Sequence, residues 1–299
     1  MGEVDEWVGR ASSVQVGGEA IAVIDVPARR SGNGPPLLVI HGFPTSSIDF
    51  APVLDPLAED RRVVLLDLPG YGLSAKSDRP YSLFGQTDVV EAVAGHAGLR
   101  EVDLLTHDMG DSVGGELLAR ALDGTSPLQV RRRIVTNGSV YLGLAQLTEG
   151  QKLLRALPDE ALPEDAAPDV EALAAALIAL CAPSLQAGEP ARRLHAAAAL
   201  TARSGGTRLL PRLIRYLDER AAHEGRWTGA IETHSAPLAV VWGRHDPIAV
   251  AAMVDRLATR RPDTVVRWLD AGHWPMVERP DAFAEAALAF LDGVDPGSP

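Results

Sequence analysis

The sequence predicts an α/β protein with a mostly parallel central sheet flanked by helices and an inserted all-helical segment. Three observations support this prediction. Short, continuously apolar runs recur along the chain, and such runs are typical of strands buried on both faces of a parallel sheet. Segments with helical spacing of apolar residues separate these runs, as crossover connections require. The alternation stops near residue 140 and resumes near residue 238.

The individual elements follow from their patterns. Two β-branched runs on either side of Gly17-Gly18 predict a hairpin over 12–27. Apolar runs predict the later strands, and amphipathic spacing predicts the helices between them. We expect strands over 37–40, 62–68, 102–105, 132–136, 238–242 and 264–269, and helices over 82–98, 112–122, 250–258 and 280–290, with a further helix ending near residue 58.

The segment 140–227 shows a different pattern. It contains no convincing strand, and its Ala, Leu and Arg residues recur with helical spacing. Prolines interrupt these helical patterns, so several short helices are expected rather than one long one. We therefore predict a helical cap (lid) over 140–227 and an α/β core built from 1–139 and 228–299.

Composition excludes several classes of protein. The chain has 299 residues, of which 46% are hydrophobic and 23% charged, values that are ordinary for a globular protein. Its net charge of -12 argues against nucleic-acid partners and anionic membranes. No apolar run is long enough to span a membrane, and the acidic start does not resemble a secretory signal, so a cytoplasmic protein is expected. The single cysteine, Cys181, and the spacing of the histidines predict neither a metal site nor a cofactor.

The turn at 106–110, Thr-His-Asp-Met-Gly, is the centre of the predicted site. It joins the strand over 102–105 to the following helix with almost no intervening loop. A strand that reverses so abruptly into a helix must hold its middle residue in a strained backbone conformation, which requires small neighbours. That middle residue is Asp108.

Three further motifs stand in order with this turn. They are His-Gly-Phe-Pro at 41–44, Asp-x-Pro-Gly-x-Gly-x-Ser at 67–74, and Gly-His at 272–273. Together with the turn at 106–110, these motifs resemble the α/β-hydrolase fold family over essentially the whole chain. An Asp at the turn is similar to the epoxide hydrolases and haloalkane dehalogenases of that family. The run over 106–112 and the Arg-Trp-x-Gly-Ala segment at 226–230 are similar to the mesoderm-specific transcript branch.

The resemblance implies a role for each residue of the site. Asp108 would attack an sp³ carbon and form an alkyl ester, which water then hydrolyses. His273 would be the general base, and Asp246 would orient its imidazole. The backbone N–H groups of Phe43 and Met109 would form the oxyanion hole. The chain order of nucleophile, acid and histidine is the order that this fold uses.

Other interpretations of the same residues stay open. Asp108 could simply cap the following helix, and Asp246 could be a surface turn residue before Pro247. A Gly-x-Ser-x-Gly motif at 110–114 would suggest a serine esterase or lactonase using Ser112, although that serine lies on the helix beyond the turn. A non-catalytic small-molecule receptor is possible as well, because a fold does not determine function. Asn137-Gly138 follows a strand but offers no carboxylate, so we assign it no role.

The leaving group separates two substrate classes. Opening of an epoxide requires a proton donor, and related enzymes take a tyrosine from the cap. Tyr216 lies where that donor is expected, and Tyr141 is a weaker candidate. Departure of a halide requires N–H donors, commonly a Trp after the nucleophile, but here that residue is Met109. Epoxide hydrolysis to a diol is therefore favoured over haloalkane hydrolysis, with a small apolar organic substrate and water as the only partners. The sequence does not indicate an oligomeric state.

Overall fold

The computed structural model describes residues 2–30, 32 and 34–293 and contains a single eight-stranded sheet. The strand order is β1-β2-β4-β3-β5-β6-β7-β8. The pairs β1–β2 and β2–β4 are antiparallel, and all other pairs are parallel. The strands are β1 (Ser12–Val16), β2 (Glu19–Val26), β3 (Leu37–Ile40), β4 (Val63–Leu66), β5 (Glu101–His107), β6 (Gln129–Thr136), β7 (Leu238–Gly243) and β8 (Val265–Leu269). The predicted mostly parallel sheet is confirmed.

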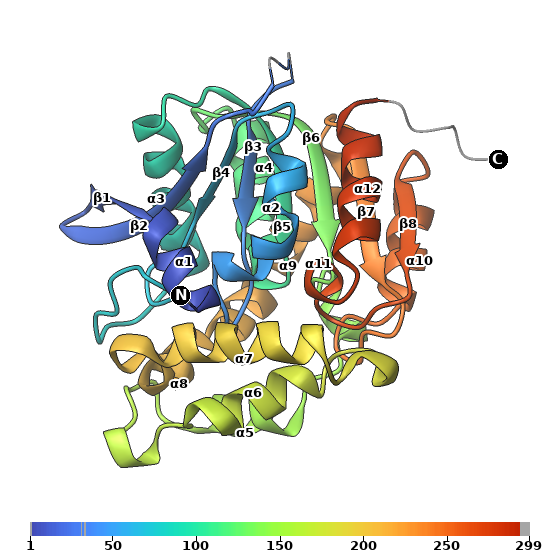
Figure 1. Cartoon of the computed structure of the whole chain (residues 1–299). Helices are drawn as coiled ribbons and strands as arrows, with labels where there is room; N and C mark the ends of the chain where they lie inside the picture. The colour runs from blue at the N-terminus through green and yellow to red at the C-terminus, as the bar shows by residue number, and fades with distance from the viewer. Residues whose placement is uncertain (1, 31, 33, 294–299) are drawn as a thin grey trace.

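Helices cover both faces of the sheet (Figure 1). Alternate residues of a strand point to opposite faces. Thus Leu37 and Val39 of β3 pack in the layer of α2 and α12, whereas Leu38 and Ile40 pack in the layer of α3 and α4. The core helices are α1 (Glu3–Arg10), α2 (Ala51–Leu57), α3 (Leu83–His96), α4 (Met109–Leu122), α10 (Ala252–Arg260), α11 (Pro275–Glu278) and α12 (Pro280–Leu291), and a 3-10 helix, Ser47–Phe50, precedes α2.

The segment after β6 is helical, as expected. Its α-helices are α5 (Glu149–Ala156), α6 (Val170–Ile178), α7 (Glu189–Ala202), α8 (Leu210–Leu213) and α9 (Tyr216–Thr233), with 3-10 helices at Leu142–Leu144, Glu164–Ala166, Pro183–Leu185 and Arg203–Leu209. Figure 1 shows α5 to α8 grouped beyond one end of the sheet. Helix α9 is interrupted at His223, and its second half packs on α4 with Trp227 buried. The limits 140 and 227 for a separate cap therefore stay a prediction.

Helix α1 was not anticipated from the sequence. It spans eight residues and buries only Trp7, whose indole Nε1 donates to Ser47 Oγ at 3.3 Å. So short a helix is marginal alone, and tertiary contacts must stabilise it. In this structure α1 packs on α7, far along the chain.

Candidate active site

The turn between β5 and α4 has the strained geometry that the sequence predicts. Asp108 adopts φ 50° and ψ -118°, and α4 begins at the next residue. The surrounding backbone leaves no room for side chains. A Cβ on Gly42 would lie 2.5 Å from Asp108 Cβ, and one on Gly110 would lie 2.6 Å from the carbonyl oxygens of Ile40 and His41. The glycines thus allow β3 and the start of α4 to close around the Asp108 carboxylate.

Two backbone N–H groups point at this carboxylate. Phe43 N donates to Asp108 Oδ2 at 2.9 Å, and the backbone N–H of Met109 also bonds to the carboxylate. Burial raises the pKa of Asp108, while the charge of His273 and these two N–H groups act in the opposite direction. The donors predicted from the motif at 41–44 and from the residue after Asp108 therefore converge on one group.

His273 and Asp246 form a buried pair. Nδ1 of His273 lies 2.8 Å from Asp246 Oδ2, while Asp246 Oδ1 accepts from the backbone N–H groups of Ile248 and Ala249 at 2.7 and 3.0 Å. Burial alone would lower the pKa of His273, but the charge and hydrogen bond of Asp246, together with the charge of Asp108, raise it to about 9. The charges of Asp246 and Asp108 thus favour the imidazolium form of His273 in the free site. Asp246 is no exposed turn residue.

The comparisons with known proteins identify the family of this chain. The model of the Alpha/beta hydrolase family matches residues 37–286. The chain belongs to the alpha/beta hydrolase family. It is 41% identical over 275 residues to the hydrolase LipZ of Mycobacterium tuberculosis, covering 88% of this chain and 91% of that protein. It is 29% identical to the mesoderm-specific transcript homolog protein of Bos taurus, covering 86% of this chain and 78% of that protein.

A solved structure resembles this alpha/beta hydrolase over nearly its whole length. The haloalkane dehalogenase DbeA of Bradyrhizobium elkani superposes with a TM-score of 0.76 at 21% identity, covering 96% of this chain and 99% of that one. At this identity the likeness shows the fold alone. The predicted α/β-hydrolase fold is thereby confirmed.

Asn137 is a residue of this hydrolase's site that sequence reasoning set aside. Its Nδ2 donates to Asp246 Oδ2 at 2.7 Å, and its Oδ1 accepts from Gly243 N at 2.9 Å. Asn137 has φ 45°, a conformation that asparagine tolerates better than most residues. It was set aside for lacking a carboxylate, yet here its amide supports one. The available signal was its place at the carboxyl end of β6, beside β7.

We expect Asn137→Gly to weaken the support of Asp246 without straining the backbone, because glycine tolerates positive φ. A hydrogen bond to a charged group contributes about 1.5–3 kcal/mol. Turnover should therefore slow by about 10- to 100-fold, as measured by steady-state kinetics. The exposed Asp263→Asn variant, away from this pair, serves as the control. Unchanged kinetics in Asn137→Gly would show that its amide does not support the pair.

The motifs at 41–44 and 67–74 hold the loops around the site in place through hydrogen bonds. His41 Nδ1 donates to the Gly42 carbonyl at 2.8 Å, and its Nε2 accepts from Leu68 N at 3.0 Å. Asp67 accepts from Leu73 N at 2.7 Å, and it also accepts from the backbone N–H of Ser47 at 2.9 Å. These bonds fasten the loop that carries Phe43 to the turn at 67–74. This explains why both motifs accompany the Asp108 turn.

The two candidate tyrosines have different surroundings. Tyr216 is buried, its ring lies 5.6 Å from that of Phe43, and burial together with the charge of Asp108 raises its pKa well above the usual value. Among the described residues its hydroxyl has no hydrogen-bond partner. Tyr141 instead donates to Glu232 at 2.8 Å and packs in a separate apolar cluster. The structure therefore brings only Tyr216 towards Asp108.

Sequence reasoning also missed Tyr71, within the motif at 67–74. Its hydroxyl lies 3.2 Å from the sulfur of Met109, and its ring packs edge-on to His41. Burial and the charge of Asp108 raise the pKa of Tyr71 well above the usual value. A second protonated tyrosine thus lies at the Asp108 turn.

Ser112 lies in α4, one turn beyond Asp108, and is buried. Its Oγ accepts a hydrogen bond from Arg220 of α9, whose other terminal nitrogen donates to the Val140 carbonyl at 2.7 Å. A serine nucleophile needs a base within hydrogen-bond reach. A guanidinium cannot be that base, so Ser112 contacts a structural partner here.

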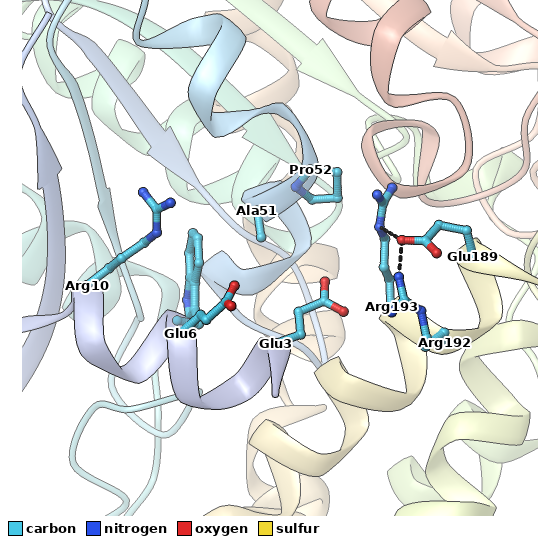
Figure 2. Close-up of a pocket in the computed structure, with 9 residues that line it drawn as sticks. Glu3, Glu6, Arg10, Ala51, Pro52, Glu189, Arg192 and Arg193 are labelled. Carbon is cyan, nitrogen blue, oxygen red and sulfur yellow. Dashed lines mark hydrogen bonds and ion pairs between the residues drawn. The ribbon is translucent and has the colours of Figure 1, made fainter. Parts of the chain in front are cut away.

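An apolar cavity of about 270 Å³ adjoins Asp108's neighbours Phe43 and His273. Leucine and alanine side chains of the helical segment make up half of its lining residues, and Thr148, Gln151 and His273 are its polar members. A second cavity, of about 340 Å³, lies between α1, α2 and α7. Figure 2 shows its charged lining, in which Arg192 and Arg193 pair with Glu189. Because the first of these two cavities contacts the site, it is the candidate substrate pocket.

Two further findings concern the described residues only. None of their helices is long and apolar enough to cross a membrane. No group of three or more His, Cys, Asp or Glu side chains among them could hold a metal ion.

Proposed function

We propose that this alpha/beta hydrolase forms an alkyl ester on Asp108 and that its substrates are small apolar epoxides, which it hydrolyses to diols. One observation carries the proposal. At the position of the nucleophile stands a buried carboxylate that accepts from two backbone N–H groups, beside a histidine held by Asp246. A helix cap alone would need neither the paired donors nor the histidine.

In the first half-reaction Asp108 attacks an epoxide carbon. A carbon–oxygen bond to the carboxylate forms, the ring carbon–oxygen bond breaks, and the released oxygen takes the hydroxyl proton of Tyr216. The tyrosinate regains a proton from the His273 imidazolium. Esterification removes the charge of Asp108, which is one cause of the raised pKa of His273. The imidazole can then be neutral, as a general base must be.

In the second half-reaction neutral His273 takes a proton from water, and the hydroxide attacks the ester carbonyl. The N–H groups of Phe43 and Met109 stabilise the developing oxyanion, a contribution worth about 2.7–4 kcal/mol per donor in other hydrolases. The alkyl–oxygen leaves with the proton from His273, giving the diol. The carboxylic acid left on Asp108 then transfers its proton to His273, which restores the carboxylate and the imidazolium.

The apolar cavity supports the substrate class. No lysine or arginine contributes to its described lining. The one cationic group on its described wall, His273, is already paired with Asp246, so a phosphate or carboxylate group would be desolvated there without a free cationic partner, which is costly. Uncharged aliphatic or aromatic epoxides fit this lining best.

Haloalkanes are the second candidate class. The two classes share the ester on Asp108 and differ in how the leaving group is stabilised. Met109 offers no side-chain N–H for a halide, whereas Tyr216 offers a hydroxyl for an alkoxide. An esterase using Ser112 is disfavoured by the bond between Ser112 and Arg220.

A single turnover in ¹⁸O-labelled water tests the ester mechanism. Water attacks the ester carbonyl, so one labelled oxygen should remain in the peptide that carries Asp108, and mass spectrometry should detect it. The diol from that turnover should carry no label. Turnover with an unlabelled Asp108 peptide would overturn the mechanism. Absence of both adduct and turnover with epoxide and haloalkane panels would favour a receptor.

Tyr216→Phe should slow alkylation of Asp108 by epoxides about 10²-fold or more, because general-acid catalysis of this kind contributes about 10²–10⁴-fold. Alkylation by haloalkanes should be unaffected, since halide departure needs no proton. Single-turnover formation of the adduct measures both rates. Tyr141→Phe is the matched control, because its hydroxyl bonds to Glu232. Equal epoxide rates in Tyr216→Phe and wild type would exclude Tyr216 as the donor.

A further inference from the structure

The loop that carries His273 is joined to the helical segment by its backbone. His273 N donates to the Leu180 carbonyl at 3.0 Å. A Cβ on Gly272 would lie 2.4 Å from Leu180 O and 2.6 Å from Ala182 N. The residues before and at His273 therefore pack directly against segment 180–182, which follows α6. Only glycine at 272 permits so close an approach.

Glu278, at the end of α11, binds both sides of this contact. Its Oε2 accepts from Gly272 N at 2.8 Å and from Ala182 N at 2.9 Å, and its Oε1 accepts from Trp274 N at 3.0 Å. The side chain is 3% exposed. A carboxylate that accepts several backbone N–H bonds away from water holds those groups strongly. One buried side chain thus fixes the residues on either side of His273 and the helical segment together.

We propose that Glu278 is a positioning residue that couples segment 180–182 to the His273 loop, so that the imidazole is correctly placed only while that segment is docked. The proposal rests on the proposed role of His273 as the general base. Glu278 touches no substrate in this arrangement. It acts through the backbone of residues 272–274, and the carbonyl of His273 accepts in turn from His107 Nε2 at 2.9 Å.

The same segment reaches the substrate pocket. Leu180 lines the apolar cavity beside His273, and its carbonyl is the acceptor for His273 N. A ligand that displaces Leu180 would therefore displace the His273 loop. Occupation of the cavity and placement of the base are coupled through one stretch of backbone.

Titratable groups from several elements lie near His273 and affect the pKa of its imidazole. They are Asp246 after β7, Asp108 after β5, Glu278 of α11, His107 of β5 and Asp49 of the 3-10 helix before α2. Loss of the Glu278 charge should lower the pKa of His273, because a nearby negative charge favours the imidazolium.

Glu278→Gln tests the coupling in the full-length protein. An amide cannot accept at both of its polar atoms, so at least one of the three N–H bonds is lost. We expect hydrolysis of the Asp108 ester to slow by about 10- to 100-fold, the range for a misplaced catalytic group. Alkylation should change less than about threefold, because Asp108 is held elsewhere. Rapid-quench mass spectrometry would then show accumulation of the ester.

Two readouts do not depend on turnover. The His273 ring protons, followed by NMR against pH, should titrate at a lower pH in Glu278→Gln. Amide hydrogen exchange should accelerate in both 180–182 and 272–274. Glu116→Gln is the matched control, because Glu116 is also buried and accepts from Trp227 Nε1 at 2.8 Å and Arg226 Nε at 2.7 Å on α9. It should lower stability without changing these readouts.

The outcomes separate the two proposals. If no substrate forms an ester with the wild type, the proposed function fails, and the titration and exchange measurements still test Glu278. An unchanged His273 titration, or faster exchange confined to 272–274, would overturn the coupling. The same changes in Glu116→Gln would overturn it as well, because they would then reflect general destabilisation.

Discussion

Replacing Asp108 with alanine is expected to abolish the covalent intermediate and to lower turnover by at least about 10⁴-fold, as loss of the nucleophile does in other hydrolases. The physical reason is that no other described group lies where the two N–H donors of Phe43 and Met109 converge. Steady-state diol formation and intact-protein mass spectrometry measure the two effects. Alanine keeps the strained backbone but removes a carboxylate whose charged form is disfavoured by burial, so the folded state should not lose stability through this charge.

Asp111→Asn is the matched control for that substitution. Asp111 is also buried, lies three residues further along, and has a pKa raised to about 8 by burial. It is therefore largely protonated at neutral pH, and an amide of the same shape replaces it at small electrostatic cost. Turnover in Asp111→Asn should stay within about tenfold of wild type. Full turnover in Asp108→Ala would contradict the ester mechanism.

His273→Gln is expected to trap the ester. Formation of the ester needs the Asp108 carboxylate and the Tyr216 proton, and His273 acts only afterwards by returning that proton. Hydrolysis needs a base to activate water, so the second half-reaction should be lost. General-base catalysis contributes about 10²–10⁴-fold, and hydrolysis should slow by that factor. Intact-protein mass spectrometry should show one added substrate mass per chain, located by peptide mapping on Asp108.

His245→Gln is the control for this experiment. His245 is exposed and pairs with Asp270 at 2.7 Å, so it lies on the surface near the same loop without facing Asp246. It should turn over normally and accumulate no adduct. An adduct in His273→Gln on any residue other than Asp108 would redirect the mechanism to that residue. Rapid hydrolysis of the ester in His273→Gln would require another base.

Much of the fold follows from local patterns. The apolar runs of β3, β4, β5 and β7 identify buried strands because a parallel strand must be apolar on both faces. The Asp108 turn was predictable because its strain demands small neighbours on both sides in sequence, and Gly110 supplies one of them. The N-terminal hairpin was predictable because paired glycines allow its tight turn.

The features that the sequence did not reveal concern contacts between distant segments. Helix α1 is short and has one buried residue, so its periodicity carries little signal until α7 covers it. The role of Asn137 depends on Asp246, which lies over a hundred residues later in the chain. The sequence around Asn137 contains no pattern that predicts a carboxylate partner. Likewise, only the tertiary structure shows that Tyr216 packs near Phe43 and Asp108, whereas Tyr141 packs in another cluster and bonds to Glu232.

The sequence by itself determined the fold class and the strained turn, and it predicted which residue types would serve as acid, base and backbone donors, since these depend on residue type and local spacing. Only the tertiary structure decided which groups meet. It brought Phe43 N to Asp108, Asn137 to Asp246, and Glu278 to both the His273 loop and segment 180–182. The physical reason is that hydrogen bonds act over about 3 Å, whereas the residues that form them stand tens to hundreds of positions apart.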